Sequence, residues 1–174
     1  MHRTLLDDII QTDYGQFDLI WAEGLGFDGD VDRFFEGQVN GLVGVADPEG
    51  AYLNLARRSG GSAVTITLHD DSPDGADPTW EDVVEVSVTI PDNASAKWSS
   101  WAGESSGTLT IPPGTYRLRV SARGRDAGGV GEFAEGVVDF YLLELWPARH
   151  RPDSILKIGS ENAAYWHAEV GRHH

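Results

Sequence analysis

Closely spaced aspartates are the residues of this sequence whose spacing most suggests chemistry. Asp28, Asp30 and Asp32 alternate with single residues, as the first ligands of a calcium-binding loop do, because a hard cation needs several oxygens on a tight turn. The pattern then breaks down, since Arg33 stands where such a loop needs Gly and Val39 stands where it needs a bidentate Glu. Asp28, Asp30 and Asp32 are therefore candidate metal ligands, with a solvated acidic loop as the alternative.

A second acidic run occupies residues 70–82 and contains two prolines, which exclude regular secondary structure there. Its carboxylates could gather a cation, but no neighbouring motif fixes a coordination geometry. Contact with a protein partner is favoured, because Trp80 is an aromatic side chain of the kind that dominates binding hot spots. The candidate partner-binding residues are Asp70, Asp71, Asp74, Asp77, Trp80, Glu81 and Asp82.

Catalytic patterns are weak throughout the chain. Residues 103–107 match the Gly-x-Ser-x-Gly nucleophile elbow, but that elbow must be followed by a helix, and residues 108–111 read as a strand. None of the six His forms a ligand pair inside a predicted element, and the chain has no Cys to act as a thiol nucleophile or a metal ligand. We therefore predict that the protein is not an enzyme and has no catalytic residue.

The net charge of −15 is concentrated in the first half of the chain. Residues 1–85 hold 18 acids and four Arg, a balance of −14, whereas residues 86–174 hold ten acids and nine Lys or Arg, a balance of −1. A field of this sign repels nucleic acid and membrane surfaces and attracts basic proteins or divalent cations. The predicted partner is therefore a basic protein, although acidity that only maintains solubility is the alternative.

The bulk properties indicate a single globular domain. A chain of 174 residues with 40% hydrophobic residues can bury a core. The absence of Cys is typical of a reducing compartment, and the N-terminus lacks a signal-peptide pattern, so the expected location is the cytoplasm. No apolar run approaches the roughly 20 residues of a membrane span. No cofactor is expected, with calcium retained as the alternative.

Short segments in which apolar and polar residues alternate, joined by turn residues, must position these candidate side chains. The predicted strands are residues 17–21, 38–46, 51–57, 63–69, 83–90, 94–101, 107–111, 115–123 and 137–146. Such spacing without strand–helix alternation predicts an all-β fold, an antiparallel β-sandwich of the jelly-roll or Ig/C2-like kind. Residues 1–150 form this domain, and residues 151–174 form a C-terminal extension with a short helix capped by Ser160.

Two further sets of residues, one of arginines and one of tryptophans, each have a structural and a functional interpretation. Arg117, Arg119 and Arg123 share one strand face because their spacing is even, and an exposed face paired with acids on a neighbouring strand is favoured over an anion-binding patch. Trp98 and Trp101 could stack on sugar rings if exposed, but burial in the sandwich is favoured. A calcium- or carbohydrate-binding β-sandwich module is therefore the alternative function.

Three segments resemble the competence protein J family. They are Asp13-Tyr-Gly-Gln-Phe-Asp-Leu19, Pro113-Gly-Thr-Tyr-Arg-Leu-Arg-Val120 and Asp139-Phe-Tyr-Leu-Leu-Glu-Leu-Trp-Pro147. Glu36-Gly-Gln38 and Trp80-Glu-Asp82 resemble uncharacterised actinobacterial proteins with the same ending. The better-known member of the family inhibits a DNA-entry nuclease. The resemblance implies a small acidic bacterial β-sandwich that binds and silences a nuclease or toxin, as an immunity protein does. The longer acidic loops and the C-terminal extension depart from the family.

Overall fold

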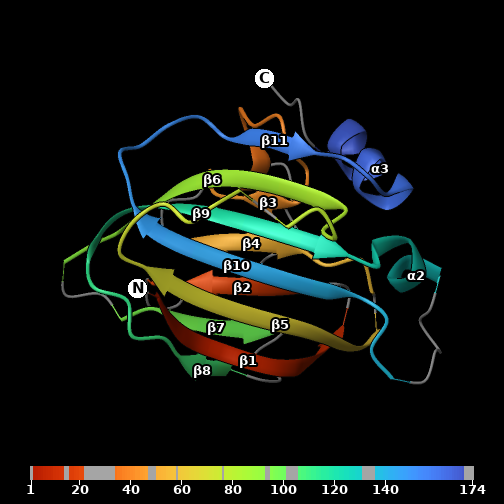
Figure 1. Ribbon diagram of the computed structural model, residues 1–174, viewed down its shortest axis with the longest axis horizontal. Coiled ribbons are helices and arrows are strands. Elements are labelled where there is room, and N and C mark those ends of the chain that lie inside the picture. Colours follow the sequence, from red (N-terminus) through yellow and green to blue (C-terminus); the bar gives the residue numbers. More distant parts are fainter. Residues whose placement is uncertain are drawn as a thin grey trace.

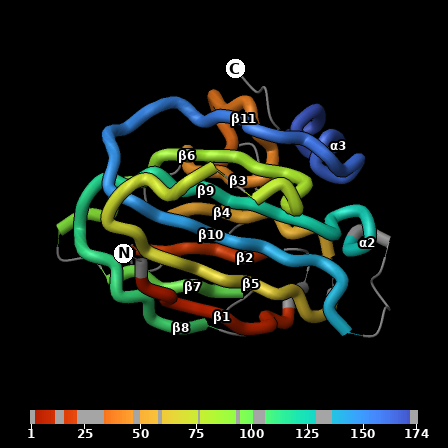
Figure 2. Tube along the Cα trace, in the orientation of Figure 1, coloured from red at the N-terminus to blue at the C-terminus, as the bar shows by residue number. Residues whose placement is uncertain are grey.

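The computed structural model describes residues 2–13, 16–21, 34–46, 50–57, 59–75, 77–92, 95–100, 106–130 and 136–170. Most residues in these ranges lie in strands, and the strands form two sheets (Figures 1 and 2). The prediction that strands dominate the fold is therefore confirmed.

Six strands form sheet A in the order β1-β5-β10-β9-β6-β11. They are β1 (His2–Asp13), β5 (Ser59–His69), β6 (Asp82–Ile90), β9 (Gly114–Arg123), β10 (Phe140–Pro147) and β11 (Ser154–Lys157). The alternation predicted for β6 and β9 matches their register, in which Val86 lies opposite Leu118. Sheet A lies in front in Figure 1, with β1 and β11 at its two edges.

Five shorter strands form sheet B in the order β3-β4-β2-β7-β8. They are β2 (Gln16–Ile20), β3 (Val43–Gly44), β4 (Gly50–Asn54), β7 (Lys97–Ser100) and β8 (Ser106–Thr108). Phe17 and Leu19 of β2 belong to the core cluster shared with sheet A. Because side chains alternate along a strand, Gln16 and Asp18 occupy the opposite face of sheet B.

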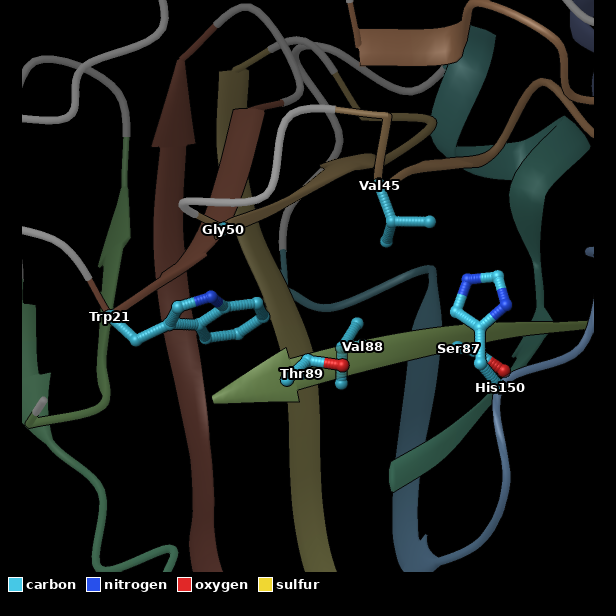
Figure 3. Close-up of a pocket in the computed structure, with 7 residues that line it drawn as sticks. All are labelled: Trp21, Val45, Gly50, Ser87, Val88, Thr89 and His150. Atoms are coloured by element: carbon cyan, nitrogen blue, oxygen red, sulfur yellow. The ribbon is translucent and has the colours of Figure 1, made fainter. Parts of the chain in front are cut away.

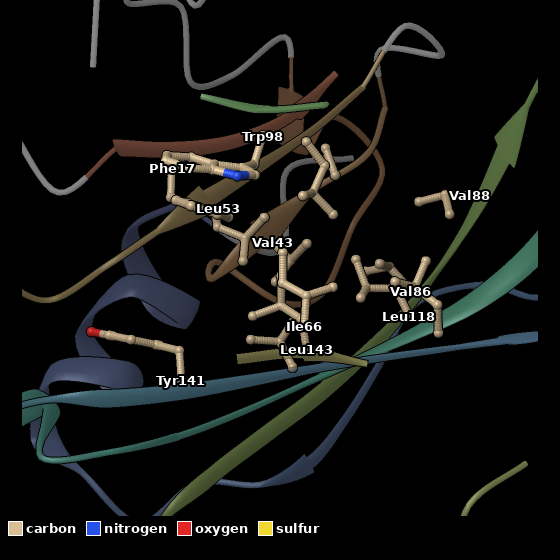
Figure 4. Packing of buried hydrophobic residues seen from close by; sticks show 14 of the residues in the cluster. Phe17, Val43, Leu53, Ile66, Val86, Val88, Trp98, Leu118, Tyr141 and Leu143 are labelled. Atoms are coloured by element: carbon tan, nitrogen blue, oxygen red, sulfur yellow. The ribbon is translucent and has the colours of Figure 1, made fainter. Parts of the chain in front are cut away.

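The main hydrophobic core lies between the two sheets (Figure 4). Ile66, Leu118 and Leu143 of sheet A are completely buried. Phe17 stacks on Trp98 from sheet B, with ring centroids 5.8 Å apart and an interplanar angle of 13°. Each fully buried side chain of this size contributes about 1.5–3 kcal/mol to folding, so this core stabilises the association of the two sheets.

One strand pair corrects the expectation of a purely antiparallel sandwich. β10 pairs with β5 in parallel, with Leu143 opposite Ile66, and it pairs with β9 in the antiparallel sense. A parallel pair needs a long connection, and here the whole of β6 to β9 lies between the two partners in sequence. Alternating patterns in single strands carry no information about such a pairing.

The strand predicted at residues 38–46 is mostly irregular, and only β3 forms there. Side-chain amides replace the strand hydrogen bonds. Gln38 Nε2 donates to the Val43 carbonyl at 2.7 Å, and Asn40 Oδ1 accepts from the Leu42 and Val43 backbone N–H groups at 2.9 and 2.8 Å. Both amides are buried, so these bonds satisfy the local backbone without a neighbouring strand.

The sequence pattern did not predict β1, β11 or the helix α2 (Arg125–Val130), which lies between the strands predicted at residues 115–123 and 137–146. The second helix, α3 (Glu161–Glu169), confirms the predicted C-terminal helix, because the Ser160 side chain accepts from the Ala163 backbone N–H at 3.0 Å. β11 pairs with β6, so the described part of the C-terminal extension joins sheet A. No helix among the described residues is long and apolar enough to cross a membrane.

Candidate partner-binding surface

The acidic loop, residues 70–81, crosses the outer face of sheet A from the end of β5 to the start of β6 (Figure 1). The structure describes all of it except residue 76. Its middle lies over β9, because Arg119 Nη1 donates to the Asp74 carbonyl at 2.7 Å. Its end lies at the end of β9, since the Glu81 backbone N–H donates to the Ala122 carbonyl at 2.9 Å. The loop is therefore fixed on the sheet at two points.

Cationic side chains hold the loop through its backbone. Lys157 Nζ, from β11, donates to the carbonyls of Pro78 and Trp80 at 3.2 and 2.8 Å. Arg119 likewise binds the Asp74 carbonyl rather than its carboxylate. Because the anchoring cations use main-chain oxygens, they do not neutralise the acidic side chains of the loop.

Trp80 anchors the loop as well. The guanidinium of Arg123 lies 5.0 Å from the centre of the Trp80 ring and 4.8 Å from that of Phe140, so it sits between the two aromatic rings. Such a contact contributes about 0.5–1 kcal/mol at a partly exposed site. Trp80 is half-buried and packs on its own sheet, which leaves only part of its ring available to a partner.

Four of the predicted partner-binding residues, Asp70, Asp71, Asp74 and Asp77, are exposed on this loop. No ion pair joins any of these four carboxylates to another residue that the structure describes. Asp77 closes a turn, since its carboxylate accepts from the Thr79 backbone N–H at 2.8 Å. Its hydrogen bonds to Thr79 lower the pKa of Asp77, with a smaller contribution from Arg123. The four side chains spread negative charge along a loop whose backbone is held on sheet A.

The last two predicted residues have structural roles. Glu81 is exposed, and its carboxylate accepts from the Gly124 backbone N–H at 2.7 Å. Asp82 is completely buried. Its carboxylate accepts from the backbone N–H groups of Gly159 and Ser160 at 2.9 and 3.1 Å and from the Ser160 hydroxyl at 2.7 Å. Asp82 is therefore inaccessible to a partner, and its inclusion among the contact residues is corrected.

Beneath the loop, the predicted arginine face forms a buried charge network. The Glu85 carboxylate binds Arg117 Nε and Arg119 Nε, each at 3.1 Å. Arg119 Nη1 also lies 3.7 Å from the Glu144 carboxylate on β10. Arg117 and Arg119 are paired as predicted, but they are buried rather than exposed, because the loop and the segment after β10 cover them. The even spacing predicted that the arginines share a face, but it did not predict that the acidic loop and the segment after β10 cover this face.

The predicted metal ligands Asp28, Asp30 and Asp32 lie outside the described residues, as do Trp101 and residues 103–105. Within the described ranges, no group of three or more His, Asp or Glu side chains is arranged to hold a metal ion. Trp98 is only 9% exposed and is part of the core, so it offers no face to a sugar ring. The interpretation of Trp98 as a sugar-stacking residue is therefore wrong.

A pocket of about 130 Å³ opens between β6 of sheet A and residues at the ends of the sheet B strands β2, β3 and β4 (Figure 3). Its lining residues are Trp21, Val45, Gly50, Ser87, Val88, Thr89 and His150. None of the predicted partner-binding residues lines it, and His150 is its only ionisable side chain. The Ser87 hydroxyl in this lining binds Arg117 Nη1 and the Arg151 backbone N–H, each at 3.0 Å.

Comparison with solved structures places this geometry in a known context. One match is the crystal structure of ComJ, inhibitor of the DNA degrading activity of NucA, from Bacillus subtilis, with a TM-score of 0.58 and 16% identity. The chain has the ComJ fold. A second match, crocagin biosynthetic gene J, has a TM-score of 0.59 and 16% identity. No family model and no curated protein sequence matches the chain.

The likeness to ComJ extends over most of the molecule. It covers 85% of this chain and 99% of ComJ, and the second match covers 86% and 99%. The resemblance inferred from short motifs is thereby confirmed at the level of fold.

Sequence reasoning missed the residues that organise the surface. Arg119 and Lys157 hold the acidic loop, and Leu156 and Ile158 are exposed beside it. The short run of Ile155, Leu156 and Ile158 after Pro152 was the available signal for β11. The carbonyl contacts of the two cations had no sequence signal, because any residue type supplies a carbonyl.

Proposed function

We propose that this chain is a non-enzymatic protein-binding domain that inhibits a basic nuclease or toxin through its acidic loop. The observation that carries the proposal is that Asp70, Asp71, Asp74 and Asp77 are all exposed along one loop whose backbone is held by Arg119 and Lys157. The similarity in fold to ComJ, an inhibitor of the DNA-degrading activity of NucA, supports the same reading.

The electrostatics explain why a nuclease is a suitable partner. An enzyme that degrades DNA must present cationic groups to phosphates, and closely spaced carboxylates can occupy the same groups. A net charge of −15 would accelerate association with such a surface and would disfavour acidic proteins. Because the loop is already anchored, its four carboxylates lose little conformational freedom on binding.

A pull-down with the purified chain from its native host, at low and high salt, tests the proposal. We expect a basic protein to be recovered at low salt and lost at high salt, since screening weakens exposed charge pairs. The recovered protein is then purified and its DNA degradation or toxicity is measured with increasing amounts of the chain. Recovery of no basic protein at either salt concentration, or recovery of one whose activity is unaffected, would contradict the proposal.

Two variants with equal changes in charge separate a local effect from a general one. The first is Asp70→Asn/Asp71→Asn/Asp74→Asn/Asp77→Asn, and the control is Asp7→Asn/Asp8→Asn/Glu36→Gln/Asp92→Asn, which changes four exposed acids elsewhere. We expect the loop variant to raise the Kd for the partner about ten-fold or more and the control to raise it much less. Equal effects of the two variants would show that only the net charge matters.

A further inference from the structure

Exposed apolar side chains gather at one edge of sheet A. The described residues expose five large hydrophobic side chains: Ile9 (53%), Val39 (38%), Leu156 (54%), Ile158 (49%) and Tyr165 (56%). Ile9 lies on β1, at the opposite edge of the sheet. The other four lie on β11, on the segment that follows it, on α3 and on residues 38–41. We call Val39, Leu156, Ile158 and Tyr165 the apolar edge.

Hydrogen bonds join the segments that carry the apolar edge. The Val39 and Asn40 backbone N–H groups donate to one oxygen of the Asp153 carboxylate at 3.0 and 2.8 Å, directly before β11. The Gly41 N–H donates to His167 Nδ1 on α3 at 2.9 Å. Segments distant in sequence are thus held together at this edge, which Figures 1 and 2 show at the top of the molecule beside α3.

The apolar edge continues directly into the acidic loop. Lys157 lies between Leu156 and Ile158, and its ammonium contacts the Pro78 and Trp80 carbonyls. A side chain at Gly159 would meet the Glu81 carbonyl at 2.5 Å, so the two backbones are in contact there. Leu156 and Ile158 therefore lie beside the end of the acidic loop, residues 78–81.

We propose that Leu156 and Ile158 form the apolar centre of the protein-binding surface and that the acidic loop forms its charged margin. This inference rests on the proposed function and names the surface that performs it. Its occupant is a protein that presents an apolar patch flanked by Lys or Arg, because that patch and those charges complement the two parts of the surface. An apolar centre within a polar margin is the usual composition of protein interfaces.

Two observations favour contact through side chains rather than addition of a strand. β11 is the last strand of sheet A, but it has only four residues. It also carries Lys157, and short edge strands with Lys resist pairing with other chains. Leu156 and Ile158 are about half exposed in a chain otherwise rich in charge, and adjacent exposed apolar residues mark interaction sites.

The test compares Leu156→Ser/Ile158→Ser with Ile9→Ser, which removes an equally exposed apolar side chain at the far edge of the sheet. The probe is the basic protein recovered by the unmodified chain, purified and titrated by calorimetry. We expect Leu156→Ser/Ile158→Ser to raise the Kd about ten-fold or more, as loss of a hot spot does, and Ile9→Ser to change it by less than about two-fold. Thermal melting of each variant checks that it is folded, and the single variants Leu156→Ser and Ile158→Ser replace the double variant if it is not.

Each failure has a distinct signature. An unchanged Kd for Leu156→Ser/Ile158→Ser, or an equal loss with Ile9→Ser, would overturn the surface while leaving the proposed function standing. If only the variant with the four loop aspartates replaced lost binding, the binding surface would consist of the loop carboxylates alone, and the apolar centre would be wrong. If light scattering showed a dimer that Leu156→Ser/Ile158→Ser dissociates, the occupant would be a second copy of the chain and the proposal would be wrong. Recovery of no partner would overturn both proposals.

Discussion

Replacing Asp18 by Asn is expected to stabilise the protein at neutral pH. Asp18 lies on β2 opposite Tyr52 of β4, and only 7% of its surface is exposed. Burial raises the pKa of this carboxyl from 3.8 to about 6, although the hydrogen bond from Gln16 lowers it in part. Burial and the nearby Asp18 charge also raise the pKa of Tyr52. The ionised carboxylate is therefore less favourable in the folded chain than in the unfolded chain.

The raised pKa of Asp18 sets the size of the expected change in the free energy of unfolding. Between pH 3.8 and about 6, the folded chain retains a proton on Asp18 that the unfolded chain has released. Rising pH in this window therefore lowers the free energy of unfolding. Above the window the loss is complete and amounts to about 3 kcal/mol, because one pKa unit corresponds to about 1.4 kcal/mol. The neutral amide of Asp18→Asn avoids this loss and still accepts the hydrogen bond from Gln16.

Urea unfolding of the unmodified chain and of Asp18→Asn, followed by circular dichroism, measures the effect. Asp18→Asn should be more stable by about 3 kcal/mol at about pH 7, and the difference should shrink to a few tenths at about pH 3.5. The control, Asp92→Asn, changes an exposed acid and should alter stability by less than about 0.5 kcal/mol. Equal stability of Asp18→Asn and the unmodified chain at pH 7, or a gain independent of pH, would refute the argument from burial.

Three other outcomes follow from the surface. Asp82→Ala should lower the free energy of unfolding by about 3 kcal/mol, because three donors lose their acceptor in a buried site, whereas Asp77→Ala should have a much smaller effect; urea unfolding measures both. Arg119→Met should release the Asp74 carbonyl from β9 and accelerate cleavage of the acidic loop by an aspartate-directed protease, and an unchanged cleavage rate would show that Lys157 and Trp80 suffice to hold it. Millimolar calcium should leave the melting temperature unchanged, and a rise would restore the three aspartates of the calcium-like pattern as ligands.

Strands with a clean period of two were predictable from sequence. In β6 and β9, apolar residues such as Val86 and Leu118 alternate with polar ones, because only one face of sheet A meets the core. β1 was missed because its register shifts between Thr4 and Leu6, which breaks the alternation. Leu5 and Leu6 consequently both pack partly on the core, a pattern that does not resemble a strand with one buried face.

The candidate surface was predicted less completely than the fold. Clustered acids and turn residues identified the loop, since charge and Pro are local signals. The burial of Asp82 was not predictable, because its partners Gly159 and Ser160 are distant in sequence. The apolar edge was missed for the same reason, as Leu156 becomes part of a surface only when β11 pairs with β6.

The parallel pairing of β5 with β10 has a consequence for the order of assembly. β10 fills the position between β5 and β9, so the centre of sheet A remains open until residues 140–147 are available. During synthesis the apolar faces of β5 and β9 have no common neighbour for most of the time that the chain is emerging. Contacts between such distant segments slow folding and prolong the exposure of unpaired strands. The high negative charge of residues 1–85 would then also keep incomplete chains apart, a role that begins before any partner is bound.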